Sequence, residues 1–192
     1  KIRSNVETII TEMGLANKRA PALRHYDYGI LLGAFLDGVR NRLAELVSLY
    51  KSGTQFDSLV VLTGARILRT GTGEKDSVEN LCNEKLSPLP FKKGWKMAQD
   101  MPYKTETDMI RAVLDQVELP EEMVKALHGK IIIVDTPAPQ GRERPSTLDT
   151  YKKWIAEYKP KEGSSLLAVS YPLLWAFQQL VAETILKGKY SV

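Results

Sequence analysis

Two stretches decide the fold class of this chain: Tyr28-Gly-Ile-Leu-Leu-Gly33 and Leu59-Val-Val-Leu-Thr-Gly-Ala-Arg66. Each is a short apolar run that reaches a glycine and then opens onto polar or basic residues. Between them, residues 36–51 carry apolar side chains at helical spacing, and Gly53 follows as a helix stop. The order strand, helix, strand predicts a βαβ unit, and ligands of open α/β sheets bind just beyond such strand ends.

The rest of the chain continues the alternation of strands and helices. We expect strands over residues 27–33, 57–63, 130–135 and 165–170, and helices over residues 5–13, 36–51, 105–117, 120–127, 145–158 and 172–186. A further strand would begin at Tyr190. This pattern predicts a three-layer Rossmann-like α/β domain, with a mostly parallel sheet of about four to five strands and helices on both faces. The last helix is mostly apolar, so we expect it to be well buried, with Trp175 and Phe177 in the core.

Residues 64–104 interrupt the alternation. The stretch contains several glycines and prolines and has no sustained periodicity, apart from a short helix expected around residues 78–83. Long loops inside compact domains are commonly functional, so a lid or specificity insert is one interpretation and an idle surface insertion is the other. We therefore predict a single α/β domain over residues 1–192, with 64–104 as a long insert or lid.

Composition is that of an ordinary soluble globular protein. Of the 192 residues, 43% are apolar and 26% charged, which is typical of that class. No apolar run approaches the ~20 residues that span a bilayer, and residues 1–18 are too mixed to predict a signal peptide. We expect a soluble protein with no membrane span, and the cytoplasm as its compartment.

Charge and reactive residues exclude several function classes. The net charge of +4 is spread along the chain rather than clustered, so we expect no nucleic-acid partner. Cys82 is the only cysteine and His25 and His128 are the only histidines, so neither a metal site nor a Ser-His-Asp triad is expected. The chain also lacks the spacings of a dinucleotide fingerprint, a phosphate-binding P-loop and a hydrolase nucleophile elbow. No motif in the sequence predicts a particular cofactor.

Polar and basic residues gather where the predicted parallel strands end. The residues expected at this edge are Gly33, Thr63, Gly64, Arg66, Asp135, Thr136 and Ser170, and the helices that follow begin with Arg40, Arg42, Glu106, Ser146, Thr147 and Asp149. Glycine allows close approach of a ligand, helix N-termini favour anions, and arginine binds phosphate or carboxylate bidentately. The pattern predicts a site for a nucleotide-like, phosphorylated or carboxylated small molecule.

Each of these residues also has a purely structural interpretation. Ser146 and Thr147 can cap a helix, and Glu106 and Asp149 suit the first helical turn through the helix dipole alone. Arg42 can equally lie on the charged face of an amphipathic helix.

The order of the motifs resembles the SanA/ElyC/YdcF-like family of unknown function, over roughly residues 27–186. The resemblance rests on Ile30-Leu-Leu-Gly33, Arg42-Leu-Ala44, Val60-Val-Leu-Thr-Gly-Ala-Arg66, Thr105-Glu-Thr-Asp-Met109, Ser146-Thr-Leu-Asp-Thr150 and Leu167-Ala-Val-Ser170. It implies a Rossmann-like fold and a link to cell-envelope processes. Because binding of S-adenosylmethionine has been attributed to YdcF, the resemblance makes that compound one candidate partner.

The resemblance also assigns expected roles to individual residues. It implies ligand-binding positions at Gly33, Arg42, Gly64, Thr147 and Ser170, and it matches Glu106 to the family's glutamate at a helix start. The chain departs from the family after the last strand, where Tyr171-Pro-Leu-Leu-Trp175 lacks the family's histidine and arginine. We therefore expect Glu106 or Asp149 to handle protons if there is catalysis, and Arg42, Arg66 and Arg144 to hold the anion.

Three hypotheses follow from the sequence. The first is an enzyme, a transferase or hydrolase acting on a nucleotide-like or envelope-precursor-like molecule. The second is a ligand-binding or regulatory module that uses the same pocket without turnover. The third is a protein-interaction domain that uses the 64–104 insert.

Overall fold

The centre of the molecule is a four-stranded parallel sheet. The computed structural model describes residues 2–12, 20–71, 73–171, 174–186 and 190. The strands are β1 (His25–Leu32), β2 (Gln55–Gly64), β3 (Ile131–Thr136) and β4 (Leu166–Val169). They lie in the order β3-β2-β1-β4, and every pairing is parallel. The predicted α/β class is confirmed. The strand expected from Tyr190 onward falls mostly outside the described residues.

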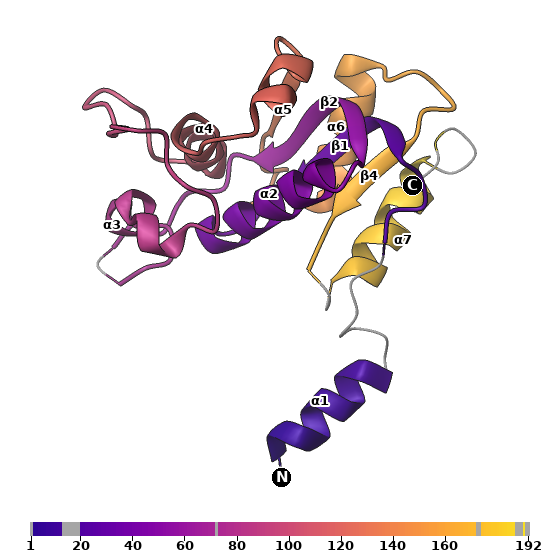
Figure 1. Cartoon of the computed structure of the whole chain (residues 1–192), viewed down its shortest axis with the longest axis horizontal. Helices are drawn as coiled ribbons and strands as arrows, with labels where there is room; N and C mark the ends of the chain where they lie inside the picture. Colours follow the sequence, from indigo (N-terminus) through magenta and orange to yellow (C-terminus); the bar gives the residue numbers. More distant parts are fainter. Residues whose placement is uncertain (1, 13–19, 72, 172–173, 187–189, 191–192) are drawn as a thin grey trace.

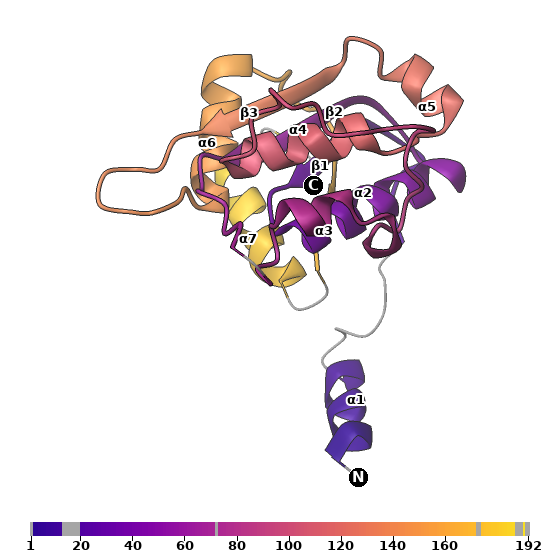
Figure 2. The same cartoon turned by 90° about the vertical axis from the view of Figure 1, so that its left-hand side faces the viewer.

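Helices cover both faces of the sheet. The helices of the described part of the chain are α1 (Ile2–Glu12), α2 (Leu36–Lys51), α3 (Val78–Cys82), a 3-10 turn η1 (Glu84–Leu86), α4 (Glu106–Gln116), α5 (Glu121–Ala126), α6 (Thr147–Tyr158) and α7 (Trp175–Leu186). Helices α2 and α4 lie over one face and α6 and α7 over the other, while α1 lies apart from the sheet and its helices (Figure 1). The view in Figure 2 shows α3 and α4 on the same side of the molecule as α2.

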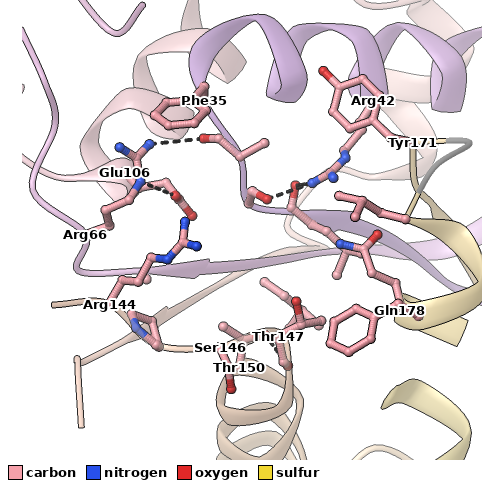
Figure 3. Close-up of a pocket in the computed structure, with 18 of the residues that line it drawn as sticks. Phe35, Arg42, Arg66, Glu106, Arg144, Ser146, Thr147, Thr150, Tyr171 and Gln178 are labelled. Atoms are coloured by element: carbon pink, nitrogen blue, oxygen red, sulfur yellow. Dashed lines mark hydrogen bonds and ion pairs between the residues drawn. The ribbon is translucent and has the colours of Figure 1, made fainter. Parts of the chain in front are cut away.

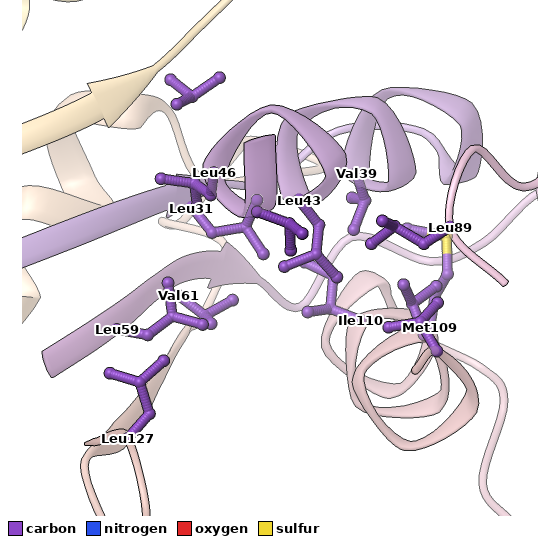
Figure 4. Packing of buried hydrophobic residues seen from close by; sticks show 14 of the residues in the cluster. Leu31, Val39, Leu43, Leu46, Leu59, Val61, Leu89, Met109, Ile110 and Leu127 are labelled. Atoms are coloured by element: carbon purple, nitrogen blue, oxygen red, sulfur yellow. The ribbon is translucent and has the colours of Figure 1, made fainter. Parts of the chain in front are cut away.

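Side chains of each strand alternate between two apolar clusters. Leu31 of β1 and Leu59 and Val61 of β2 pack with α2 and α4 (Figure 4). Their neighbours Ile30 and Val60 pack on the other face, against α6 and α7. Because both faces are buried, the central strands read as continuous apolar runs rather than alternating ones.

The order of the strands creates a topological switch point. The chain moves from β1 to β2 to β3 in one direction and then returns to place β4 on the other side of β1. The connections on the two sides of β1 therefore diverge at its carboxyl end. In open α/β sheets, a crevice forms there and is the usual ligand site.

The 64–104 insert is tied firmly to the domain. Its apolar residues Leu81 and Leu89 are buried in the cluster beneath α2 and α4. Arg40 of α2 donates hydrogen bonds to the Leu81 carbonyl at 2.6 Å and to the Gln116 Oε1 at 2.8 Å. The predicted helix in the insert is present as α3. Arg40, expected near the ligand edge, thus anchors the insert instead.

Helix α7 is more exposed than predicted. Phe177 and Leu180 are each 61% exposed, so the expectations that this helix is well buried and that Phe177 lies in the core are wrong. Ala182 and Leu186 face the sheet and are buried. A helix that packs against a sheet on one side only buries the stripe of side chains that faces the sheet. Helix α7 also carries apolar side chains outside that stripe, and these are exposed. The side chain of Trp175 lies outside the described part of the structure.

None of the helices in the described part of the chain is both long enough and apolar enough to cross a lipid bilayer.

Candidate functional site

A cavity of about 720 Å³ opens at the switch point, beyond the carboxyl ends of β1 and β2. Its other walls come from the loop before α6, the first turn of α6, and the segment that leads into α7. Glu106, Arg66 and Phe35 lie on one side and Arg42, Tyr171 and Gln178 on the other, with Ser146, Thr147 and Thr150 facing them from α6 (Figure 3). Segments far apart in sequence therefore meet at one hollow.

Most residues selected from the sequence line this cavity. They are Gly33, Arg42, Gly64, Arg66, Glu106, Arg144, Ser146 and Thr147. The expected residues that are not among the described residues lining the cavity are Arg40, Thr63, Asp135, Thr136, Asp149 and Ser170. Sequence reasoning did not select Phe35 and Gln178, and placed Phe177 in the core, although all three line the cavity. No periodic or motif signal marks them, because their position depends on how α7 and α2 meet the sheet.

Arg42 supplies a buried positive charge at the cavity. It is 4% exposed, and its Nη1 donates to the carbonyls of Leu32 at 2.8 Å and Gly33 at 2.7 Å. Its guanidinium lies 5.0 Å from the centre of the Tyr171 ring. Within the described ranges, Arg42 makes no ion pair, and its buried Nε has no hydrogen-bond partner. Burial lowers the pKa of Arg42, yet an arginine keeps its charge in a protein.

Glu106 occupies the space that Gly33 leaves open. Its Oε1 accepts from the Thr63 hydroxyl at 3.2 Å and its Oε2 from Arg66 Nε at 2.9 Å. A Cβ at position 33 would lie 2.0 Å from Glu106 Oε1, so glycine is needed there for the carboxylate rather than for a ligand. Burial raises the pKa of Glu106, and the hydrogen bond from Arg66 opposes that rise.

Arg66 lies at the start of the insert and connects the site to Asp76, further along the insert, and through it to α2. Its Nη1 pairs with Asp76 Oδ2 at 2.9 Å, in addition to its bond with Glu106. Asp76 is fully buried and also accepts from the backbone N–H of Leu36, at the first turn of α2. Burial would lower the pKa of Arg66, but the two carboxylates outweigh it and raise the pKa. The sequence did not reveal Asp76, because the insert carries no periodic pattern.

The start of α6 is closed by its own capping box. Asp149 Oδ2 accepts from the Ser146 backbone N–H at 2.7 Å, and Ser146 Oγ accepts from the Asp149 N–H at 3.3 Å. Asp149 also pairs with Arg142 Nη2 at 3.0 Å. The hydrogen bond from the Ser146 hydroxyl is the main reason that the pKa of Asp149 is lowered. Asp149 is thus engaged as a structural carboxylate, whereas Thr147 lines the cavity.

Gly64 and Ser170 shape the site indirectly. A Cβ at position 64 would lie 2.2 Å from Pro145 Cγ, so this glycine lets the loop before α6 approach β2 closely. Ser170 donates to the side-chain oxygen of Gln178, which itself lines the cavity. Ser170 therefore holds Gln178 rather than lining the hollow itself.

The side chains that line the cavity include more arginines than carboxylates. Four arginines and two glutamates line it: Arg42, Arg66, Arg142, Arg144, Glu106 and Glu143. Arg66 is matched by Glu106 and Asp76, and Arg142 by Asp149. Arg42 and Arg144 make no ion pair among the described residues. With Asp76 and Asp149, which lie outside the lining, the four arginines are balanced by four carboxylates in total. The first turn of α6 adds the partial positive charge of a helix N-terminus.

The described part of the chain holds no group of three or more His, Cys, Asp and Glu side chains arranged to bind a metal ion. Comparisons of this chain with protein-family models, with curated proteins and with solved structures found no match.

Proposed function

We propose that this SanA/YdcF-like chain binds a small molecule bearing a phosphate or carboxylate, in the cavity at the carboxyl edge of the sheet. The observation that carries the proposal is Arg42, a cation that is 4% exposed, lines the cavity and has no carboxylate partner in the described structure. Burying a cation that has hydrogen bonds but no ion pair is costly, and a bound anion would reduce that cost. The residues at the strand ends make a nucleotide-like compound the first class to test, and the resemblance adds S-adenosylmethionine.

Two further features support an anionic ligand. Arg144 sits at the exposed rim, where its guanidinium can bind phosphate or carboxylate oxygens bidentately. The N-terminus of α6 faces the same hollow with Thr147 at its first helical position. Three sources of positive potential therefore converge from α2, from the loop before α6 and from α6 itself.

Catalysis on such a ligand would depend on Glu106. Burial raises its pKa, which is the direction expected of a proton-handling carboxyl group, and it is the buried one of the two glutamates that line the cavity. Asp149 is already bonded to Ser146 and Arg142. We therefore assign the proton-handling role in any transfer or hydrolysis to Glu106, with binding alone as the alternative activity.

The test is calorimetry with the full chain against nucleoside phosphates, sugar nucleotides, S-adenosylmethionine and inorganic phosphate. We expect Arg144→Gln and Arg42→Lys to weaken a hit by about ten-fold or more, since a hydrogen bond to a charged group contributes about 1.5–3 kcal/mol. Arg69→Gln is the matched control, because Arg69 is exposed and lies outside the cavity lining. Melting temperatures establish that each variant is folded.

Equal affinities for Arg144→Gln, Arg42→Lys and the Arg69 control would show that the ligand binds elsewhere. Mass spectrometry of the incubated ligand then separates the two activities. A product that disappears in Glu106→Gln while binding persists supports an enzyme, and an unchanged ligand supports a binding module.

A further inference from the structure

An exposed apolar track leaves the cavity along α7. Leu174, Phe177 and Leu180 are 45%, 61% and 61% exposed. The Gln178 N–H bonds to the Leu174 carbonyl, so Leu174 belongs to the same helical turn as Phe177. Residues three apart on a helix are neighbours on its surface, so the three side chains form one stripe. We call Leu174, Phe177 and Leu180 the α7 track.

The α7 track is continuous with the proposed ligand site. Leu174 and Phe177 line the cavity, whereas Leu180 lies a further turn along the helix and outside the lining. The cavity has a charged part and an apolar part. The positive charge comes from Arg42, Arg144 and the start of α6, and the apolar surface comes from α7. Apolar surface that begins inside a charged pocket and continues outside it is suited to a ligand with two chemically different ends.

We propose that the ligand is a single amphiphilic molecule, with a phosphate or carboxylate head in the cavity and a linear apolar tail on the α7 track. The inference rests on the proposed function, because it assumes that the cavity binds the anionic head. The head would contact Arg42 and Arg144. The tail would leave the cavity past Phe177 and end near Leu180.

The dimensions of the track favour a tail over a protein partner. Six residues of helix rise about 9 Å, which is the length of a short alkyl chain. A stable protein interface buries about 800 Å² on each partner, whereas even a fully buried aromatic side chain contributes only about 150–250 Å². Three partly exposed side chains fall well short of that area. One apolar chain could cover them.

The experiment is calorimetry of the full chain with butyl, octyl and dodecyl phosphate, each below its micellar concentration. Complete burial of a methylene is worth about 0.8 kcal/mol, or roughly four-fold in affinity, and an open track gives part of that. We expect octyl phosphate to bind about ten-fold more tightly than butyl phosphate. Phe177→Ser and Leu180→Ser should reduce this ratio to about two-fold or less. Both side chains are exposed, so the variants should fold, and melting temperatures check that they do.

Val124→Ser is the matched control, because Val124 is a 50% exposed apolar residue on another helix, α5. It should leave the ratio of octyl to butyl affinity unchanged. An equal affinity for all three phosphates, with Arg144→Gln still weakening them, would overturn the tail site and leave the proposed function standing. No binding of any phosphate or nucleotide would overturn both.

Three further outcomes also contradict the inference. Octyl glucoside binding as tightly as octyl phosphate would show that the charged head is not recognised. Binding to vesicles of anionic lipid without binding to monomeric alkyl phosphates would assign the track to a membrane surface. A dimer in sedimentation that Leu180→Ser dissociates would assign it to a second copy of the chain.

Discussion

At the scale of single residues, the site is built by side chains that occupy space as well as by side chains that carry charge. Gly33 is the clearest case, because its missing Cβ is the space that the Glu106 carboxylate fills. Its φ angle is not among the positive ones, so its requirement is for room rather than for an unusual backbone conformation. Gly64 likewise leaves the space that the ring of Pro145 occupies.

Gly33→Ala should therefore destabilise the protein by about 1–3 kcal/mol, the usual cost of overpacking. Urea unfolding measures the change. The cost should shrink when Glu106→Ala is present, because the carboxylate that clashes with the new methyl group is then absent. Gly71→Ala is the control, since a Cβ there meets only Glu74 Cγ at 3.5 Å. Equal costs with and without Glu106 would show that the clash lies with the backbone of Leu62 instead.

At the scale of elements, Arg66 joins three parts of the chain that the sheet alone does not hold together. Arg66 itself lies at the start of the insert. Through Asp76, further along the insert, it reaches the first turn of α2, and through Glu106 it reaches α4. Asp76 acts as a cap for α2 supplied from a distant segment, since Phe35 at the N-cap position makes no side-chain bond. The position of the insert and the shape of the cavity are thus coupled.

Arg66→Met should cost about 3–5 kcal/mol, because it leaves two buried carboxylates without their cation. Glu106→Gln should cost less, since Arg66 keeps Asp76 and since folding already disfavours the charged form of Glu106. Urea unfolding gives both values. Hydrogen exchange in Arg66→Met should speed up over the insert and the first turn of α2. Unchanged exchange there would mean that Arg40 and the apolar contacts hold the insert without Arg66.

The capping boxes of α4 and α6 offer a matched pair of elements. Ser146→Ala and Thr105→Ala should each cost about 1 kcal/mol of stability, measured by urea unfolding, because each removes an N-cap hydrogen bond. Only Ser146 lines the cavity. Calorimetry should therefore show weaker ligand binding for Ser146→Ala alone. Equal affinities would indicate that the α6 start does not contact the ligand.

At the scale of the whole molecule, distant carboxylates tie the fold together and make it sensitive to acid. Hydrogen bonds from the Ser165 backbone and hydroxyl lower the pKa of Asp27, at the start of the pairing between β1 and β4. The bond from Ser146 does the same for Asp149. The unfolded chain binds protons more readily at both sites. The stability that these carboxylates contribute is present above their ordinary pKa of 3.8 and is lost as pH falls below it.

The free energy of unfolding should therefore fall between about pH 5 and pH 3, as measured by urea titration at each pH. Asp27→Asn should lower the free energy of unfolding at about pH 5 and should reduce the loss of stability between about pH 5 and pH 3. Asp100→Asn, at an exposed position, is the control and should leave the slope unchanged. A decline that is identical in Asp27→Asn and the wild type would place the acid-sensitive groups elsewhere.

The sequence predicted the fold well because periodicity reports burial within each element. The helix over residues 36–51 and the succession of strands and helices along the chain follow directly from such patterns. The sequence could not predict that the outer face of α7 is exposed. A helix that is apolar all round has the same sequence pattern whether neighbouring elements cover one side of it or every side. Asp76 was not predictable either, because its partners Arg66 and Leu36 are brought to it by the tertiary fold alone.

The position of β4 beside β1 has a consequence for how the chain folds. The bonds between Asp27 and Ser165 span 138 residues, whereas β1 and β2 are separated only by α2. During synthesis, β1 can pair with β2 early, but its other edge stays unpaired until β4 leaves the ribosome. An open strand edge invites association with other chains, and long-range pairing is slow. We expect the nascent chain to be most prone to aggregation in that interval, and a chaperone that shields the free edge of β1 to raise the yield of folded protein.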